Sequence, residues 1–371
     1  MKKLLPEVCT IQYGFPFDSA KFSDSNGMPL IRIRDVVRGY SETYTTEEYK
    51  SEYIVHENDL LIGMDGEFNI AKWGKTPALL NQRVCRLAPK DSIDKDYLFY
   101  FMPIALKRIE KKTPFVTVKH LSAKELNKIE IPVLSLEEQR KIAETLSKVD
   151  KLIAFREQQL AKLDEVVKAR FVEMFGESEY PCNSLISLII EGAGLSYGIV
   201  QPGDDGTGDM GVLRPVDFAD GKIKTDSIKY IDRSLGDGFK KTELNGNELL
   251  ITVRGTTGIT ALTDSRFKGM NVTRGIAVIR YDEKKIDPIY LNEYIKMEKS
   301  QQYIKEHTRG ATLQQINLSE LRDLEVVIPP LPLQRVFAIF VERVDQQKQT
   351  VQQSFEKLEL MKKALMQEYF G

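Results

Sequence analysis

Residues 121–176 read LSAKELNKIEIPVLSLEEQRKIAETLSKVDKLIAFREQQLAKLDEVVKARFVEMFG, and residues 316–371 read INLSELRDLEVVIPPLPLQRVFAIFVERVDQQKQTVQQSFEKLELMKKALMQEYFG. The two stretches align without a gap at a constant offset of 195 residues, so that Gln139-Arg140 matches Gln334-Arg335 and Phe175-Gly176 matches Phe370-Gly371. A repeat of this length indicates two copies of one structural unit. We therefore expect the function of the chain to be carried out twice.

Each copy contains the pattern of one long helix. Ser135-Leu136-Glu137-Glu138 has the spacing of a capping box, which predicts a helix from about Leu136 to about Phe175, with Gly176 as its C-cap. In the second copy Pro332 suits the first helical turn and would break a helix interior. We expect a central conserved helix at 135–176 and a C-terminal conserved helix at 330–371.

Heptad spacing predicts an apolar seam on both helices. The predicted seam and partner-docking residues are Leu146, Val149, Ile153, Leu160, Leu163, Val344, Val351, Phe355, Leu358 and Leu365. Charged residues (Arg156, Arg170, Lys348 and Lys362) occupy other seam positions, so neither helix suits a homodimeric zipper and pairing between the two helices is favoured. The alternative is two separate amphipathic helices, each packed on its own domain.

Each helix follows a region with strand patterns. In the first half these lie at 29–37, 58–64, 82–88 and 128–134, and in the second at 211–218, 247–253, 275–281 and 323–330. Short motifs recur in both regions, including Tyr13-Gly14 with Tyr197-Gly198 and Arg32…Asp35 with Arg214…Asp217. We expect two globular domains, at 1–134 and 177–329, on one shared scaffold with different loops.

Composition is typical of a soluble globular protein, with 42% hydrophobic and 29% charged residues. The three cysteines are widely spaced and no apolar stretch could span a membrane, so we expect a cytoplasmic protein without membrane contact. The three histidines lack ligand spacing, and no metal site is expected. The chain also lacks a phosphate-binding loop, a dinucleotide fingerprint and a nucleophile with a partner base, so no catalytic residues are predicted.

Although the net charge is −1, basic residues concentrate at 68–90 and 249–281. Such local surfaces are sufficient to bind phosphates, and solvated strand faces are the alternative. Loops 64–69 and 254–258 follow matching strands but carry different polar groups, as expected of loops that read different bases. Segments 113–119 and 308–314 form a second matched pair. The candidate DNA-binding residues are Arg32, Asp65, Asn69, Lys72, Lys75, Arg83, Lys119, Arg214, Arg254, Thr256, Thr257, Arg266, Lys268, Arg274, Arg309 and Gln314.

This layout resembles the specificity subunit of type I restriction–modification enzymes. The resemblance rests on the twice-occurring motif at 126–132 and 321–327, the Gln-Arg helix start and the long helix ending in Phe-Gly. Gly14-Phe15-Pro16-Phe17-Asp18-Ser19 also resembles openings in that family. It implies an α+β fold in which two mixed α/β target recognition domains are joined by two long antiparallel coiled-coil helices with pseudo-twofold symmetry.

The resemblance also implies a non-catalytic subunit that reads a bipartite, asymmetric sequence in double-stranded DNA. It would bind two modification (methyltransferase) subunits and the restriction (translocase/nuclease) subunits. S-adenosylmethionine, ATP and Mg would belong to those partners, and this chain would bind no cofactor. The alternatives are a DNA-modifying enzyme with its own active site and a coiled-coil assembly protein that does not bind DNA. The bases recognised and the length of the spacer do not follow from the sequence.

Overall fold

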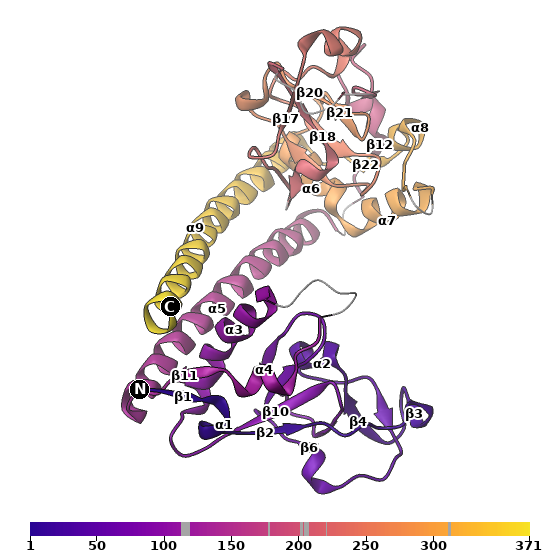
Figure 1. Cartoon of the computed structure of the whole chain (residues 1–371). Helices are drawn as coiled ribbons and strands as arrows, with labels where there is room; N and C mark the ends of the chain where they lie inside the picture. The colour runs from indigo at the N-terminus through magenta and orange to yellow at the C-terminus, as the bar shows by residue number, and fades with distance from the viewer. Residues whose placement is uncertain (113–118, 177–178, 201–202, 204–207, 220, 311–312) are drawn as a thin grey trace. The chain divides into compact units, whose positions relative to one another are not determined.

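The computed structural model describes the chain except for residues 113–118, 177–178, 201–202, 204–207, 220 and 311–312 (Figure 1). The described residues form two compact units. Unit 1 consists of Met1–Gln158 and Gln352–Gly371, and unit 2 consists of Gln159–Val351. Each unit therefore contains part of both long helices. The domain boundaries expected at 134, 176 and 329 separate globular regions from helices, and they stay a prediction.

Unit 1 contains short strands and helices, followed by the first part of the first long helix. In chain order they are β1 (Lys2–Leu4), α1 (Leu5–Val8), β2 (Cys9–Tyr13), η1 (Ser19–Lys21), β3 (Phe22–Ser23), β4 (Met28–Ile31), α2 (Ile33–Arg38), β5 (Tyr44–Thr45), η2 (Ser51–Tyr53), β6 (Ile54–Val55), β7 (Leu60–Gly63), β8 (Ile70–Lys72), β9 (Ala78–Leu80), β10 (Val84–Pro89), α3 (Lys95–Lys112), α4 (Ala123–Asn127), β11 (Glu130–Pro132) and α5 (Leu136–Phe175), where η marks a 3-10 helix.

Unit 2 follows the same plan. Its elements are β12 (Cys182–Ser184), η3 (Leu185–Leu188), β13 (Ser196–Tyr197), β14 (Met210–Leu213), η4 (Pro215–Asp217), β15 (Phe218–Ala219), β16 (Lys222–Ile223), β17 (Lys229–Ile231), η5 (Arg233–Thr242), β18 (Leu249–Thr252), β19 (Thr260–Leu262), η6 (Ser265–Phe267), β20 (Asn271–Val272), β21 (Ile276–Ile279), α6 (Pro288–Lys296), α7 (Glu298–His307), α8 (Leu318–Arg322), β22 (Glu325–Val327) and α9 (Leu331–Phe370).

The central sheets of the two units match strand for strand. The antiparallel order β2-β10-β7-β8 in unit 1 corresponds to β13-β21-β18-β19 in unit 2. A parallel pair, β4 with β9, corresponds to β14 with β20, and the closing pair β1–β11 corresponds to β12–β22. Because the pairings repeat as well as the sequence, the internal repeat extends over both mixed α/β units.

A repeated glycine marks the same close approach of two backbone segments in each unit. At Gly14 an added Cβ would lie 2.0 Å from the Asn81 carbonyl oxygen, and at Gly198 it would lie 1.8 Å from that of Val272. Any side chain would therefore push the two backbones apart. This close approach explains why the Tyr-Gly dipeptide occurs in both halves.

Two predicted strands are shorter than expected. The strand predicted at 29–37 ends at Ile31 and continues as α2, and the one predicted at 211–218 ends at Leu213 and continues as η4. The backbone N–H of Arg32 donates to Asp35 Oδ2 at 2.8 Å, and that of Arg214 donates to Asp217 Oδ2 at 2.7 Å. These aspartates are buried, and each satisfies a free N–H at the start of a helical turn. The strand prediction was therefore wrong for the second half of each stretch.

The two long helices have the predicted bounds. Both contain 40 residues, which corresponds to about 60 Å at 1.5 Å per residue. The predicted capping box precedes α5, where Glu138 N–H donates to Ser135 Oγ at 3.3 Å and Ser135 N–H donates to Glu138 Oε2 at 3.0 Å. The second helix begins at Leu331, which places Pro332 in its first turn as predicted.

The helices run antiparallel, which the contacts within unit 1 establish on their own. Asp150 Oδ1 pairs with Lys362 Nζ at 2.7 Å, and further along α5 Arg156 Nε donates to Ser354 Oγ at 3.1 Å. In unit 2 the pair is Asp164 with Lys348, at 2.6 Å. Most of the charged seam positions thus have polar partners on the other helix, which explains how an interrupted apolar seam still packs. The predicted apolar seam residues are all buried or half-buried.

A buried glutamine fixes the start of each long helix to its unit. Gln139 accepts from the Asp94 N–H at 2.7 Å and donates to the Leu134 carbonyl at 2.9 Å, while Gln334 accepts from the Asp287 N–H at 2.8 Å and donates to the Pro329 carbonyl at 2.7 Å. Both side chains are fully buried. The glutamine of the repeated Gln-Arg pair therefore has a structural role. In the described part of the chain, no helix is long and apolar enough to cross a membrane.

Candidate nucleic-acid interface

In the two basic segments predicted from the sequence, several of the basic side chains form ion pairs within the protein. Arg86 pairs with Asp59 at 3.1 Å, and in unit 2 Arg280 lies 3.6 Å from the fully buried Glu248. Lys72 pairs with Asp96 at 2.8 Å and lies over the Phe99 ring. These cations hold the scaffold together, so the basic character of the segments alone does not define a binding surface.

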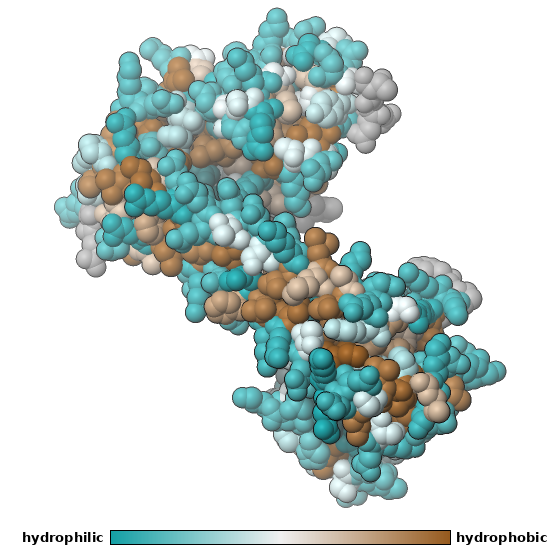
Figure 2. All heavy atoms as spheres, turned by 90° about the vertical axis from the view of Figure 1, so that its left-hand side faces the viewer, coloured by the Kyte–Doolittle hydropathy of each residue, from teal (hydrophilic) through white to brown (hydrophobic). Residues whose placement is uncertain are grey.

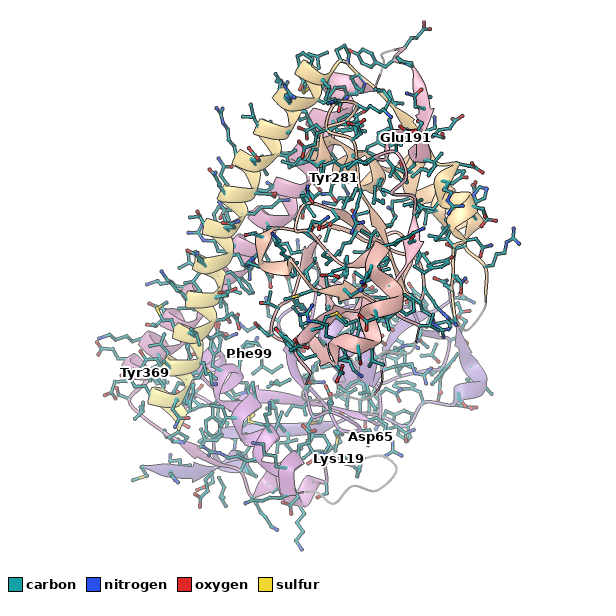
Figure 3. All side chains as sticks on the ribbon, turned by 90° about the horizontal axis from the view of Figure 1, so that it is seen from above. Asp65, Phe99, Lys119, Glu191, Tyr281 and Tyr369 are labelled. Carbon is teal, nitrogen blue, oxygen red and sulfur yellow. The ribbon has the colours of Figure 1, made fainter. Side chains whose placement is uncertain are left out.

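In unit 1, the loop after β7 meets the segment before α4. The Gly66 N–H donates to the Lys119 carbonyl at 2.9 Å, and the Leu121 N–H donates to that of Met64 at 2.7 Å. Asp65 and His120 are paired across this contact, and Figure 3 shows Asp65 and Lys119 as neighbours. We call residues 64–69 with 119–121 bridge 1.

Bridge 1 places an imidazole and a guanidinium beside a carboxylate. The Nδ1 of His120 lies 2.5 Å from Asp65 Oδ1, and Arg83 Nε lies 3.5 Å from Asp65 Oδ2. A carboxylate accepts only, so the His120 tautomer in this contact carries its proton on Nδ1. Asp65 is one-fifth exposed and His120 half-exposed. The carboxylate is therefore oriented from both sides but remains accessible.

Unit 2 contains the equivalent contact. The Gly255 N–H donates to the Gln314 carbonyl at 2.8 Å, and the Ile316 N–H donates to that of Val253 at 3.0 Å. Arg254 and Gln315 are paired across it, as Asp65 and His120 are in unit 1. We call residues 253–258 with 314–316 bridge 2. The two predicted loops thus make the same backbone contacts but carry different side chains.

The polar groups of bridge 2 have few partners. Among the residues that the structure describes, the half-buried guanidinium of Arg254 makes no hydrogen bond or ion pair. Thr257 Oγ1 contacts Thr308 Oγ1 at 3.0 Å, and Arg309 pairs with Glu320 at 3.0 Å. Thr256 and Gln314 are exposed. The loop therefore holds a cation that no acid among the described residues neutralises.

The other candidate residues lie in different surroundings. Arg32, Lys75, Lys268 and Arg274 are exposed, and no ion pair involves them within the described part of the chain. Arg214 is bound to Asp217 and to the Ser227 carbonyl. Arg266 pairs with Asp264, and its hydrogen bond lowers the pKa of that carboxyl.

The structure therefore brings together Asp65, Asn69, Arg83 and Lys119 around bridge 1. Around bridge 2 it brings together Arg254, Thr257 and Gln314 with Arg274, whose neighbour Gly275 accepts from the Val253 N–H at 2.8 Å. Lys72, Arg266 and Lys268 belong to neither group. Of the second predicted pair of segments, 113–118 and 311–312 lie outside the described residues.

Two residues of the bridges, His120 and Gln315, were missing from the sequence-based candidates. Their pairing with Asp65 and Arg254 joins segments more than fifty residues apart, which single-sequence patterns do not reveal. The available signal was their alignment with each other at the offset of 195. Among the described residues, no cluster of three or more His, Cys, Asp or Glu side chains could hold a metal ion.

Comparisons with known proteins identify similar chains among type I restriction enzyme specificity subunits. Residues 1–165 and 207–360 match the family profile of the type I restriction modification DNA specificity domain. The chain is 30% identical to the EcoBI type I restriction enzyme specificity subunit of Escherichia coli over 372 residues, covering 92% of this chain and 78% of that protein. It is 24% identical to the MjaIX specificity subunit of Methanocaldococcus jannaschii over 298 residues, covering 72% and 66% of the two chains.

Solved structures share the fold. The type I restriction-modification S subunit from M. genitalium superposes with a TM-score of 0.60 at 14% identity, covering 100% of this chain and 96% of that one. A chain from a structural study of complex assembly in the type I R-M system superposes with a TM-score of 0.60 at 16% identity, covering 100% and 97%. At these identities the likeness concerns the fold alone.

Proposed function

This chain belongs to the family of type I restriction–modification DNA specificity subunits, and on that premise we propose that its two units each read one half of a bipartite, asymmetric sequence in double-stranded DNA. The observation that carries the proposal is the repeated bridge. One backbone arrangement presents Asp65 in unit 1 and Arg254 in unit 2. Because these groups pair with different base edges, equal scaffolds would read unequal half-sites.

Exposed cations in both units supply the sequence-independent part of binding. Arg32 and Lys75 in unit 1 and Lys268 and Arg274 in unit 2 are exposed, and none pairs with an acid that the structure describes. Cations of this kind neutralise phosphates and release counterions, so affinity should fall steeply as salt rises. They would position each unit on the duplex, while the bridges would supply specificity.

The long helices are the proposed spacer and docking surface. Figure 2 shows apolar side chains, in brown, at the surface of these helices. The large apolar residues exposed on them are Leu136, Leu152, Phe155, Val166, Val172, Leu333, Val336, Ile339, Leu360 and Met361. In unit 2 a groove of about 420 Å³ is lined by Leu163, Val166 and Val351 among others. Exposed apolar surface of this kind is typical of interfaces between proteins.

Membership in the family of specificity subunits supports a non-catalytic, DNA-recognising role for this chain, and we propose that its partners carry out the chemistry. We propose that two modification subunits bind the helices and supply the S-adenosylmethionine site. Restriction subunits would supply ATP- and Mg-dependent translocation and cleavage. The length of the two helices would then set the distance between the two half-sites on the DNA. Neither alternative, a self-sufficient modifying enzyme or an assembly protein without DNA contact, is supported by the comparisons.

The test is sequence preference in the assembled complex. The full chain, co-expressed with its modification subunits, should methylate a split motif with an unread spacer and should bind duplex DNA less tightly as salt rises. The chain alone should not methylate DNA. Methylation without partners, or equal binding of the motif and random duplex, would refute the proposal.

A further inference from the structure

The two bridges differ in chemistry but agree in geometry. In each, a polar residue follows a buried strand end, a glycine comes next, and a second polar residue faces the first from the segment before a short helix. The glycines, Gly66 and Gly255, have φ values of +74° and +84°, and nothing lies within 4 Å of a Cβ added at either position. The backbone is therefore open on the side where a ligand could approach closely.

Bridge 1 ends in an acceptor. Of the roughly four lone-pair positions on the Asp65 carboxylate, His120 occupies one on Oδ1, and Arg83 lies at ion-pair distance from Oδ2. The remaining positions can accept N–H donors. The neighbouring cation and imidazole also reduce the repulsion that a bare carboxylate would experience beside phosphates. Asp65 is thus suited to a base edge that donates.

Bridge 2 ends in donors. The Arg254 guanidinium is half-buried yet has no partner among the described residues, in contrast to Arg86, Arg280 and Arg309, which all face carboxylates. The Gln315 amide, also half-buried, likewise has no partner in the described part of the chain. A partly desolvated arginine gains most from two parallel hydrogen bonds to paired acceptors. In the major groove, guanine presents such a pair at O6 and N7.

We propose that bridge 1 selects a base with an exocyclic amino group in the major groove, adenine or cytosine, through Asp65 positioned by His120, and that bridge 2 selects guanine through Arg254 beside Gln315. The inference rests on the proposed function and adds the base chemistry that each half-site must contain. It also adds His120 and Gln315 as residues that determine specificity.

The experiment uses the full chain in complex with its modification subunits and a duplex library in which every position of both half-sites is varied. Arg254→Lys retains the charge but loses the planar fork, so discrimination for guanine at one position of the second half-site should fall by about 10-fold or more. Asp65→Asn should reduce the preference for an amino base at one position of the first half-site. The base preferred there by the unaltered complex distinguishes adenine from cytosine.

The matched controls separate reading from folding and from phosphate binding. Arg274→Gln, at an exposed cation beside bridge 2, should weaken binding to all sequences and flatten its salt dependence without changing base preference. For each variant, the half-site of the other unit serves as an internal control for a folded, assembled complex. His120→Asn places an amide N–H where Nδ1–H stands and should preserve the first half-site, whereas His120→Ala should relax it.

The outcomes are distinct. If the unaltered complex prefers no split motif, the proposed function fails. If it reads a split motif but Arg254→Lys and Asp65→Asn leave both half-sites unchanged, only this inference fails. It is also overturned if the position sensitive to Arg254 is not guanine, or if the position sensitive to Asp65 is guanine or thymine.

Discussion

The ring of Phe370, at the end of α9, packs edge-on against Tyr97 in α3 with ring centroids 5.3 Å apart. At the end of α5, Phe175 packs in the same way against Tyr290 in α6, at 5.1 Å. Each long helix thus ends by docking an aromatic ring on the helix that follows the central sheet of a unit. The Phe-Gly dipeptide that closes each repeat therefore joins a long helix to a mixed α/β core.

Phe370→Ala should destabilise unit 1 by about 3 kcal/mol, because a ring that is 4% exposed is lost from a packed core. Trp73, the sole tryptophan, is buried in unit 1, so its fluorescence during urea unfolding reports on that unit. Phe175→Ala, in unit 2, is the matched control and should leave this transition nearly unchanged. Equal shifts for both variants would contradict the assignment of each ring to one unit.

Gln139→Leu should cost about 2 kcal/mol in the same Trp73 transition. The substitution leaves the buried N–H of Asp94 and the carbonyl of Leu134 without their partner. Gln158, an exposed glutamine that is also repeated (as Gln353), provides the control: Gln158→Leu should change the midpoint little. A neutral Gln139→Leu would show that the buried amide does not anchor the helix.

The capping box of α5 predicts a pH effect with a definite sign. Hydrogen bonds from the Ser135 hydroxyl and backbone N–H lower the pKa of Glu138 below its usual value. The stabilisation is therefore complete above the carboxyl's unfolded pKa and is lost as pH falls through the lower, folded pKa. In an NMR titration, Ser135→Ala should move the Glu138 pKa upward. An unchanged pKa would exclude the capping box in solution.

Thiol reactivity should separate the three cysteines. Burial raises the pKa of Cys9 and Cys85 to about 12, whereas Cys182 is exposed. Because the thiolate is the reactive form, iodoacetamide at pH 8 should label Cys182 rapidly and the other two after unfolding. Cys182→Ser should abolish the rapid reaction. Rapid labelling of Cys85 in the folded protein would contradict its buried position.

The elements with strong local signals were predictable from sequence. The helix bounds follow from the Ser135–Glu138 capping box and from Pro332. The strands β7, β18 and β21 lie within the predicted stretches, and β10 ends one residue beyond its own. The predictions for β4 and β14 were too long. In each case an aspartate accepts a hydrogen bond from the backbone N–H three residues before it, and a helical turn begins there. Strands of this kind end where a side chain takes the backbone hydrogen bond that the sheet would otherwise use. The pattern of hydrophobic residues does not show where this happens.

The residues of the candidate interface were harder to predict from the sequence. Counting basic residues overestimated the segments at 68–90 and 249–281, because Arg86, Lys72 and Arg280 face acids from other elements. Those partners become visible only when the chain is folded. His120 and Gln315 were missed for the same reason, since their roles arise from a contact between distant segments.

We expect the residues that read each half-site to lie, in sequence, between the closing strands of one unit. These strands are β1 and β11 in unit 1 and β12 and β22 in unit 2. The most direct test maps the methylation motif of a complex whose specificity chain has residues 182–327 replaced by residues 2–132. The expected motif is split and contains the first half-site of the unaltered complex twice. Persistence of the original second half-site in an assembled, methylating complex would contradict it.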